Sequence, residues 1–388
     1  MSKATSHVVY IAGPDTSADH ANACAQQQGL KPPVLLKRRG TALGWVAQQP
    51  EPTDINADSA AKAWHNASAY ALPGYVSAAL PPHQDHIKQA LNLMAAIAEG
   101  AEVASLFEQP PYSERTTPQF EMLASFQDEG DAQEIETIEY DAVNGDDVVA
   151  ENLWCKASWL SFEDDDASLR FRFSFGMVGY EDVAADLERQ RYAAQLTDAI
   201  FPESGVISNN SQLDAFMQTV VGTDKLAYVE RIIYFNAPNG GAQFHQDVER
   251  GHLGVVFAQV HGSTAWLACS KTQLMDEVQA FINHADNSTA LDELMNESML
   301  AELKEKASSR AQLNEWLDER DNEPLELLLN RCPEFYRHLF GQGYGYIINP
   351  GDIILLPQKS SDECCWHTVF CIDDFVGESL SFAIRAID

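Results

Sequence analysis

The feature that most constrains the fold is a series of short strand patterns running from the middle of the chain to its C-terminus. Leu169–Phe175 alternates strictly between apolar and other side chains, which indicates a strand with one apolar face. Further strand patterns occur at Tyr228–Phe235, at Leu253–Val260 and from Tyr344 onward, and a segment with helical spacing at about 272–343 interrupts them. This succession predicts a mainly β chain with helical additions, arranged as a two-sheet jelly roll around a small-ligand cavity.

Two hairpins are predicted, formed by Leu153–Phe162 with Leu169–Phe175 and by Leu253–Val260 with Thr264–Cys269. The second would turn at Gly262, which is a residue typical of tight turns. In the first, Arg170 and Arg172 lie on the face opposite to the phenylalanines, because side chains alternate across a strand. A solvated or ion-paired role is expected for both, with contact to a substrate as the alternative.

The N-terminal part of the chain has weaker patterns. Apolar side chains recur at helical spacing from His83 to Phe107, and Pro110-Pro111 follow, so one amphipathic helix is predicted there. A second helix is expected from Glu181 to Ile200. We therefore divide the chain into a mixed or helical N-terminal region, residues 1–130, and a second domain, residues 131–388.

The charge of the chain limits its partners. It has 25 Lys and Arg residues against 58 Asp and Glu residues, a formal net charge of -33. Such a surface repels nucleic acid and anionic membranes, so neither is expected as a partner, and a basic partner is favoured. The first residues do not resemble a secretory signal and the cysteines show no framework spacing, which predicts a reduced, cytoplasmic protein. The sequence leaves a homodimer open.

A candidate metal site lies in Phe244-His245-Gln246-Asp247. In an extended strand the side chains of residues i and i+2 point to the same side, so His245 and Asp247 can direct an imidazole and a carboxylate at one point. If a later strand brings His367 to that point, the three residues form a triad of two histidines and one carboxylate, which suits Fe(II). The simpler interpretation of His245 and Asp247 alone is a surface ion pair or a hydrogen-bonded turn.

The chain resembles the JmjC/cupin-like Fe(II)- and 2-oxoglutarate-dependent oxygenases, and their protein hydroxylase branch in particular, in the segments Phe244–Asp247, Phe257–Leu267, Pro350–Pro357 and Trp366–His367. The resemblance covers about 228–388 without the helical segment. It implies a double-stranded β-helix, the cupin-like jelly roll, in a catalytic domain at 131–388. It also implies that His245, Asp247 and His367 hold Fe(II), with 2-oxoglutarate and O2 as co-substrates. The implied reaction is hydroxylation of an amino-acid side chain in a peptide, a protein or a free amino acid.

One position departs from the family pattern. Members of the family place a Lys or an Arg there to bind the distal carboxylate of 2-oxoglutarate, and this chain has Thr264. Related oxygenases use an Arg on the last strand instead; here Arg385 shares a strand face with Ser381, and Arg pairs well with carboxylates. His261 is a further candidate cation.

Because the anchor for the co-substrate is not fixed, two alternatives stay open. One is a metal-dependent cupin enzyme that does not use 2-oxoglutarate. The other is a non-catalytic protein-interaction module, for which the acidic surface would serve a protein partner.

Overall fold

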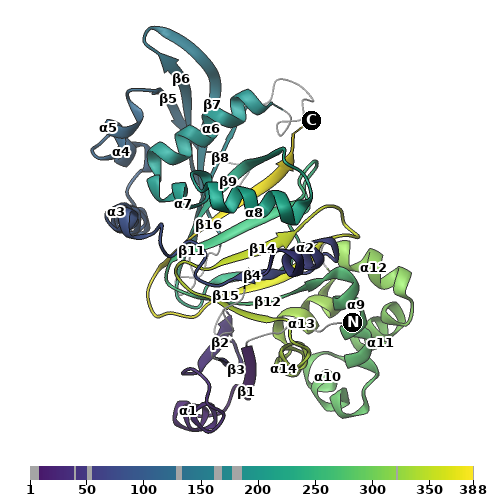
Figure 1. The fold of residues 1–388 in the computed structure, drawn as a ribbon. Coiled ribbons are helices and arrows are strands. Elements are labelled where there is room, and N and C mark those ends of the chain that lie inside the picture. Colours follow the sequence, from purple (N-terminus) through teal and green to yellow (C-terminus); the bar gives the residue numbers. More distant parts are fainter. Residues whose placement is uncertain are drawn as a thin grey trace.

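The computed structural model describes residues 8–38, 41–49, 55–127, 133–160, 168–176, 186–319 and 322–387. Within these residues the strands form three antiparallel sheets of three, four and nine strands, and helices cover their outer faces (Figure 1). The prediction of a mainly β chain with helical additions is therefore confirmed.

The nine-stranded sheet has the order β4-β14-β11-β16-β9-β8-β7-β6-β5. Its strands are β4 (Tyr70–Leu72), β5 (Phe120–Phe126), β6 (Glu134–Asn144), β7 (Asp147–Trp159), β8 (Leu169–Phe175), β9 (Leu226–Asn236), β11 (Gly254–His261), β14 (Ile353–Pro357) and β16 (Gly377–Ala386). The four-stranded sheet, in the order β10-β15-β12-β13, contains β10 (Gly241–His245), β12 (Thr264–Ser270), β13 (Gly345–Ile348) and β15 (Cys365–Cys371). The three-stranded sheet, in the order β1-β3-β2, contains β1 (Val8–Ala12), β2 (Val34–Arg38) and β3 (Thr41–Gln48).

The helices fall into two groups along the chain. Before β10 the structure has α1 (Ala18–Gln27), α2 (Ala57–His65), α3 (Gln84–Ala98), α4 (Val103–Phe107), α5 (Tyr112–Thr116), α6 (Leu187–Ile200), α7 (Gly205–Ser208) and α8 (Ser211–Val221), with short 3-10 helices at η1 (Pro81–His83) and η3 (Pro202–Ser204). Between β12 and β13 it has α9 (Lys271–Asn283), η4 (Ala285–Asn287), α10 (Ser288–Leu294), α11 (Glu297–Ser308), α12 (Arg310–Asp318), α13 (Glu323–Arg331) and α14 (Pro333–Gln342). This second group is the helical segment predicted at about 272–343. No helix among the described residues is long and apolar enough to cross a bilayer.

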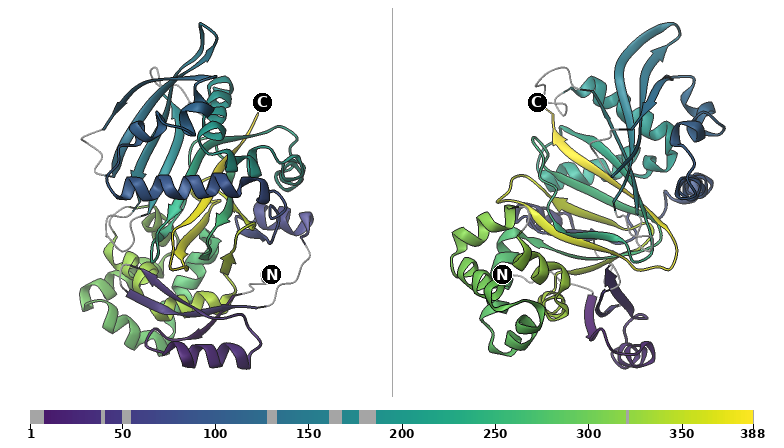
Figure 2. Two further views of the ribbon diagram at one scale, coloured as in Figure 1. Left: turned by 90° about the vertical axis from the view of Figure 1, so that its left-hand side faces the viewer. Right: turned by 180° about the vertical axis from the view of Figure 1, so that it is seen from behind.

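Three apolar clusters show how the layers pack. The largest lies on the outer face of the nine-stranded sheet, which α3, α6 and α8 cover (Figure 2). The second joins the outer face of the four-stranded sheet to helices α9 to α14 and to the three-stranded sheet. The third lies between the inner faces of the two larger sheets and includes Phe257 and Trp266, whose ring centroids are 4.7 Å apart. The two larger sheets thus face each other across an interior lined with large side chains.

The predicted hairpin of β11 and β12 is wrong. β11 pairs with β14 and β16 in the nine-stranded sheet, whereas β12 pairs with β13 and β15 in the four-stranded sheet. Gly262, with a φ of +70°, turns the chain from one sheet to the other, and a Cβ there would lie 2.9 Å from the Cα of Gly377. Nearly every residue of both strands is buried, so the apolar pattern carried no sign of which neighbour each strand takes.

The predicted helix from His83 to Phe107 is two helices. α3 ends at Ala98 and α4 begins at Val103. Gly100 between them has a φ of +94°, a conformation that a right-handed helix does not contain. The amphipathic spacing continues across this break, because both helices pack on the same apolar cluster.

The N-terminal part also contains strands that its composition did not indicate. β1, β2 and β3 form their own sheet, β4 pairs with β14, and β5 pairs with β6. The predicted hairpin of β7 and β8 is observed, with its tip at 161–167 outside the described residues. The predicted domain boundary at residue 130 also lies outside them, as do residues 181–185, so the helix expected from Glu181 is described from Leu187 as α6.

Candidate metal centre

The four-stranded sheet brings the three predicted ligands together. β10 ends at His245, and β15 places His367 directly opposite it in the register. Asp247 comes two residues after the end of β10, so the loop that follows the strand supplies the carboxylate. The alternation argument had placed Asp247 on the same strand as His245, and that detail is wrong. One ligand atom from each of these residues lies within 4.8 Å of the other two.

Hydrogen bonds determine which nitrogen of each ring faces the centre. Nδ1 of His245 lies 2.7 Å from the carbonyl oxygen of Gln243, and Nδ1 of His367 lies 3.2 Å from that of Cys365. Each Nδ1 donates to its carbonyl, so Nε2 is the atom turned towards Asp247. The two Nε2 atoms lie 3.4 Å from different carboxylate oxygens of Asp247. Metal-binding histidines are typically oriented by such a bond at the other nitrogen, and this donor set fits a divalent cation such as Fe(II).

The charges of the three residues depend on one another. Burial alone raises the pKa of Asp247, but His245 and His367 outweigh burial and hold that pKa well below its ordinary value. Burial lowers the pKa of His245, and Asp247 reverses the shift, so the pKa of His245 is raised. Burial and the neighbouring charge of His245 lower the pKa of His367. The carboxylate of Asp247 is therefore ionised, and a cation that binds at this centre would take the place of the proton that the raised pKa of His245 favours.

Residues from distant parts of the chain hold the two strands of the triad. Asn330 of α13 accepts a hydrogen bond from the backbone N–H of Phe244 at 2.8 Å, which satisfies the outer edge of β10. Arg38 of β2 donates to the carbonyl oxygen of Val369 in β15, and its guanidinium carbon lies 4.3 Å from the centroid of the Phe370 ring. Neither contact has a signal in the local sequence around the triad, because each depends on how the helical segment and the N-terminal sheet pack.

Trp266 of β12 supports the other side of His367. The two rings are stacked, with centroids 5.5 Å apart and an interplanar angle of 26°. The indole N–H of Trp266 donates to the hydroxyl of Thr264 at 2.8 Å, and that hydroxyl donates to Oε1 of Gln259 at 3.1 Å. Thr264 is fully buried, so its hydroxyl serves to position Trp266.

The other predicted site residues are spread over the interior and its rim. Ser381 lies on the inner face of the nine-stranded sheet. Arg385, near the end of β16, packs against the loop that follows Asp247: a Cβ on Gly251 would lie 2.4 Å from its Nη1. His261 ends β11, with its ring centroid 5.3 Å from that of Phe375. Roles for these residues in binding a co-substrate stay predictions.

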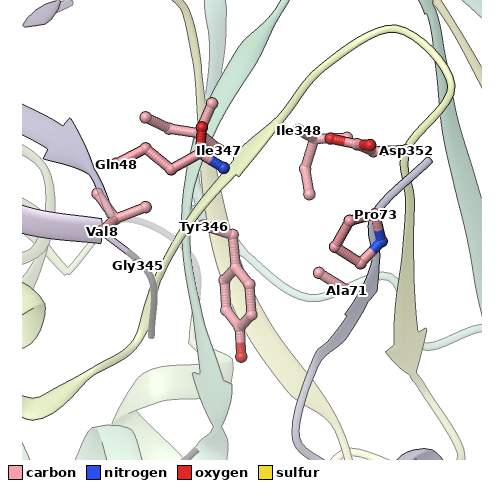
Figure 3. A pocket seen from close by; sticks show the side chains of 9 residues that line it. All are labelled: Val8, Gln48, Ala71, Pro73, Gly345, Tyr346, Ile347, Ile348 and Asp352. Carbon is pink, nitrogen blue, oxygen red and sulfur yellow. The ribbon is translucent and has the colours of Figure 1, made fainter. Parts of the chain in front are cut away.

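A pocket elsewhere in the protein is separate from the triad. It is lined by Val8, Gln48, Ala71, Pro73, Gly345, Tyr346, Ile347, Ile348 and Asp352 (Figure 3). Its carboxylate, Asp352, accepts hydrogen bonds from the backbone N–H groups of Gly74 at 2.6 Å and of Asn349 at 2.8 Å. The carboxylate therefore ties together two loops, and the lining contains none of the predicted ligands.

Comparison with known proteins gives similarities to solved structures at low sequence identity. No family model matches the chain, and no curated protein matches it. It is similar to an oxidoreductase of the 2OG-Fe(II) oxygenase family from Burkholderia pseudomallei, at 6% identity and a TM-score of 0.31 over 87% of this chain and 93% of that one. It is also similar to YcfD, a ribosomal oxygenase from Escherichia coli solved with cobalt and succinic acid, at 13% identity and a TM-score of 0.23 over 58% of this chain and 41% of that one. Likenesses at these TM-scores carry no argument, so a function has to be argued from the site.

Proposed function

We propose that the chain is an Fe(II)- and 2-oxoglutarate-dependent oxygenase, with the metal held by His245, Asp247 and His367. The observation that carries the proposal is the convergence of two Nε2 atoms and one carboxylate at a single point inside the fold. Two histidines and one carboxylate on one side of the metal are the typical ligand set of non-haem Fe(II) oxygenases, because this set leaves positions open for substrate and oxygen.

The order of the strands supports a double-stranded β-helix as the scaffold. From β9 to β16 the chain moves back and forth between the two larger sheets: β9, β11, β14 and β16 belong to one, and β10, β12, β13 and β15 to the other. Four strands of each sheet then form the two layers of a jelly roll, with the helical segment inserted between β12 and β13. The strands β5 to β8 extend one layer beyond the roll.

The residues of the chain have distinct parts in this proposal. When bound, Fe(II) would supply the positions at which 2-oxoglutarate and O2 react. Asp247 contributes negative charge, and the backbone carbonyls of Gln243 and Cys365 keep the two imidazoles in register. Phe257, Trp266 and the other apolar side chains between the sheets exclude water from the interior, which protects the reaction from side products.

For the substrate we propose an amino-acid side chain, in a peptide, a protein or a free amino acid, that is hydroxylated at a C–H bond. The net charge of -33 supports a basic polypeptide as the partner and argues against nucleic acid and anionic membranes. A cytoplasmic location, a homodimer and a division into domains near residue 130 are parts of the same proposal. The free state of all seven cysteines, six of them buried, is compatible with a reducing compartment.

One observation favours a second candidate. Thr264 stands where the resembling family has a cation, and its hydroxyl is engaged by Gln259 and Trp266. A metal-dependent cupin enzyme that does not use 2-oxoglutarate would need no cation there. A non-catalytic interaction module would not need the triad at all.

The test is turnover of 2-oxoglutarate by protein reconstituted with Fe(II) and exposed to air. We expect Fe(II)-dependent conversion to succinate above the background of free iron, stimulated by part of a panel of basic peptides, and lost in His367→Ala. Tight iron binding with no succinate would favour the second candidate. No iron binding at all would favour the interaction module.

A further inference from the structure

Two arginines of β8 share a sheet face with residues that line the interior of the roll. In β8, the residues Leu169, Phe171, Phe173 and Phe175 are buried against the outer helices, so Arg170 and Arg172 point to the opposite face. Arg170 is paired in register with Tyr234 of β9, and Tyr234 in turn with Ser379 of β16. Directly paired residues in an antiparallel sheet place their side chains on the same face.

The row formed by Arg172 confirms which face this is. Arg172 is paired with Ile232, Ile232 with Ser381, and Ser381 with Phe257. Phe257 belongs to the apolar cluster between the two sheets and contacts Trp266, which stacks on His367. Both arginines therefore stand on the face of the nine-stranded sheet that, within the roll, is turned towards the sheet that carries the triad.

The two arginines differ in their partners. Arg172 is neutralised by Glu230, at 2.5 Å, and lies 3.6 Å from Glu249. Among the residues that the structure describes, none forms an ion pair or a hydrogen bond with Arg170, although its side chain is partly buried. A partly desolvated guanidinium without a partner is costly, and a bound anion removes that cost.

Tyr234 links this cation to the triad. Burial and then the carboxylate of Asp247 raise the pKa of Tyr234, whereas Arg170 and Arg172 lower it. The phenol is therefore close enough to feel both the triad carboxylate and the two guanidinium groups. In the row of paired residues, Tyr234 stands between Arg170 and the next strand of the roll.

The residues at the predicted anchor positions are less suited to binding a carboxylate of the ligand. Thr264 is neutral, and Arg385 packs against Gly251 and has a partner of its own. We infer that Arg170 is the residue that binds a carboxylate of the ligand seated at the triad. This inference rests on the proposed function. It places the anion-binding residue on β8, which lies next to the jelly roll, and not on one of the strands of the roll.

The carboxylate has two possible sources with the same chemistry. It is either the distal carboxylate of 2-oxoglutarate or an acidic group of the molecule that is oxidised. The first source makes Arg170 a determinant of co-substrate choice. The second makes the substrate acidic, which overturns the basic substrate expected from the net charge, because the surface charge does not determine the charge inside the cavity.

The experiment compares Arg170→Ala with the wild-type protein, both loaded anaerobically with Fe(II). Keto-acid binding is followed by the visible charge-transfer band, and binding of succinate and glutamate by calorimetry. Four ligands are compared: 2-oxoglutarate, 2-oxobutyrate, succinate and glutamate. 2-Oxobutyrate lacks the distal carboxylate, and glutamate is added after 2-oxoglutarate. Arg170→Lys tests rescue by charge, Arg385→Ala tests the other anchor, and Arg310→Ala, at an exposed arginine paired with Asp276, is the control for net charge.

We expect Arg170→Ala to weaken 2-oxoglutarate binding by about 10- to 100-fold and 2-oxobutyrate binding by less than about threefold, with partial rescue by lysine. Loss of glutamate binding alone would assign the subsite to the oxidised molecule and still support the inference. Unchanged binding of every carboxylate, or a loss seen only in Arg385→Ala, would overturn it. If the wild type shows no keto-acid band, the proposed function fails. Succinate binding then decides the inference: weaker binding in Arg170→Ala than in the wild type supports it, and equal binding overturns it.

Discussion

The protein has two notable carboxylate sites on opposite faces of the nine-stranded sheet, one partly exposed and one buried, and they behave in opposite ways. Inside the roll, Asp247 lies between His245 and His367, and its pKa is held well below the ordinary value. On the outer face, Glu203 of η3 and Glu378 of β16 are both fully buried and interact with each other. Burial raises the pKa of both glutamates, and for Glu378 the charge of Glu203 adds to the effect.

The comparison shows that the partners of a carboxyl group, together with its burial, decide what it binds. Asp247 has two imidazole nitrogens as neighbours, so it stays ionised and can hold a cation. Glu203 and Glu378 have each other, and their carboxyl oxygens have no hydrogen-bond donor among the described residues. Two such groups are most stable when they share a proton, which then supplies the missing donor. The charge at the first site therefore suits a cation, and the pairing at the second suits a shared proton.

The largest expected effect is the loss of the metal. His367→Ala removes one of two nitrogen ligands, so we expect Fe(II) affinity, measured by anaerobic calorimetry, to fall by at least about 100-fold. His284→Ala, at an exposed histidine of the helical segment, is the control and should leave affinity unchanged. Retention of wild-type affinity in His367→Ala would show that the two carboxylate sites do not differ in the way described.

The next effect concerns the dependence of stability on pH. Glu203 and Glu378 hold protons more tightly in the folded protein than in the unfolded chain, so their contribution to stability is fully present below the unfolded pKa near 4.5. It is lost as the pH rises through the raised folded values. The double variant Glu203→Gln/Glu378→Gln cannot titrate there. We expect its unfolding free energy, relative to wild type, to increase by about 2 kcal/mol between about pH 5 and about pH 8.

Chemical denaturation at several pH values measures this difference. Glu363→Gln, which removes an exposed carboxylate paired with Lys359, is the matched control and should follow the wild type. Parallel curves for the double variant and the wild type would mean that the two glutamates do not share a proton.

A smaller effect is expected at the edge of β10. Asn330→Ala leaves the buried N–H of Phe244 without its acceptor, which costs about 1–3 kcal/mol of stability. Because Phe244 precedes His245, we also expect Fe(II) affinity to fall by about 10-fold. Asn314→Ala, at a partly exposed asparagine bonded to Asp362, is the control for loss of an amide. If stability falls by the expected amount while iron affinity stays unchanged, this hydrogen bond stabilises the fold and does not position the metal ligands.

The smallest effect is expected at the ring that stacks on His367. Trp266→Phe keeps an aromatic ring but loses the indole N–H that donates to Thr264, worth about 1 kcal/mol. We expect the unfolding free energy to fall by about 1 kcal/mol and the iron affinity to fall by less than about fivefold. A change of iron affinity as large as that of His367→Ala would make Trp266 as important to the metal centre as a ligand.

Local patterns in the sequence predicted most of the strands around the triad, and they predicted that His245, Asp247 and His367 converge, as they do in the structure. Alternation along β8 was enough to place Arg170 and Arg172 on one face, but it could not show whether water or another sheet covers that face. It is the pairing of β8 with β9, between segments far apart in the chain, that shows both side chains to share the sheet face that lines the roll.

Three further features were beyond prediction for similar reasons. β11 and β12 are buried on both faces, so their apolar runs do not reveal that they belong to different sheets. Asn330 and Arg38 reach the triad strands from segments whose own patterns say nothing of that contact. Glu203 and Glu378 are 175 residues apart in the chain and meet only when η3 packs on β16.

The most direct test of the account is the visible absorption of metal-free protein titrated anaerobically with Fe(II) and then with 2-oxoglutarate. If His245, Asp247 and His367 hold the metal with positions left open, a weak charge-transfer band appears when both are present and with neither alone. The same titration of His367→Ala should then show no band. Iron that binds tightly to the triad without any band on addition of 2-oxoglutarate would contradict the account.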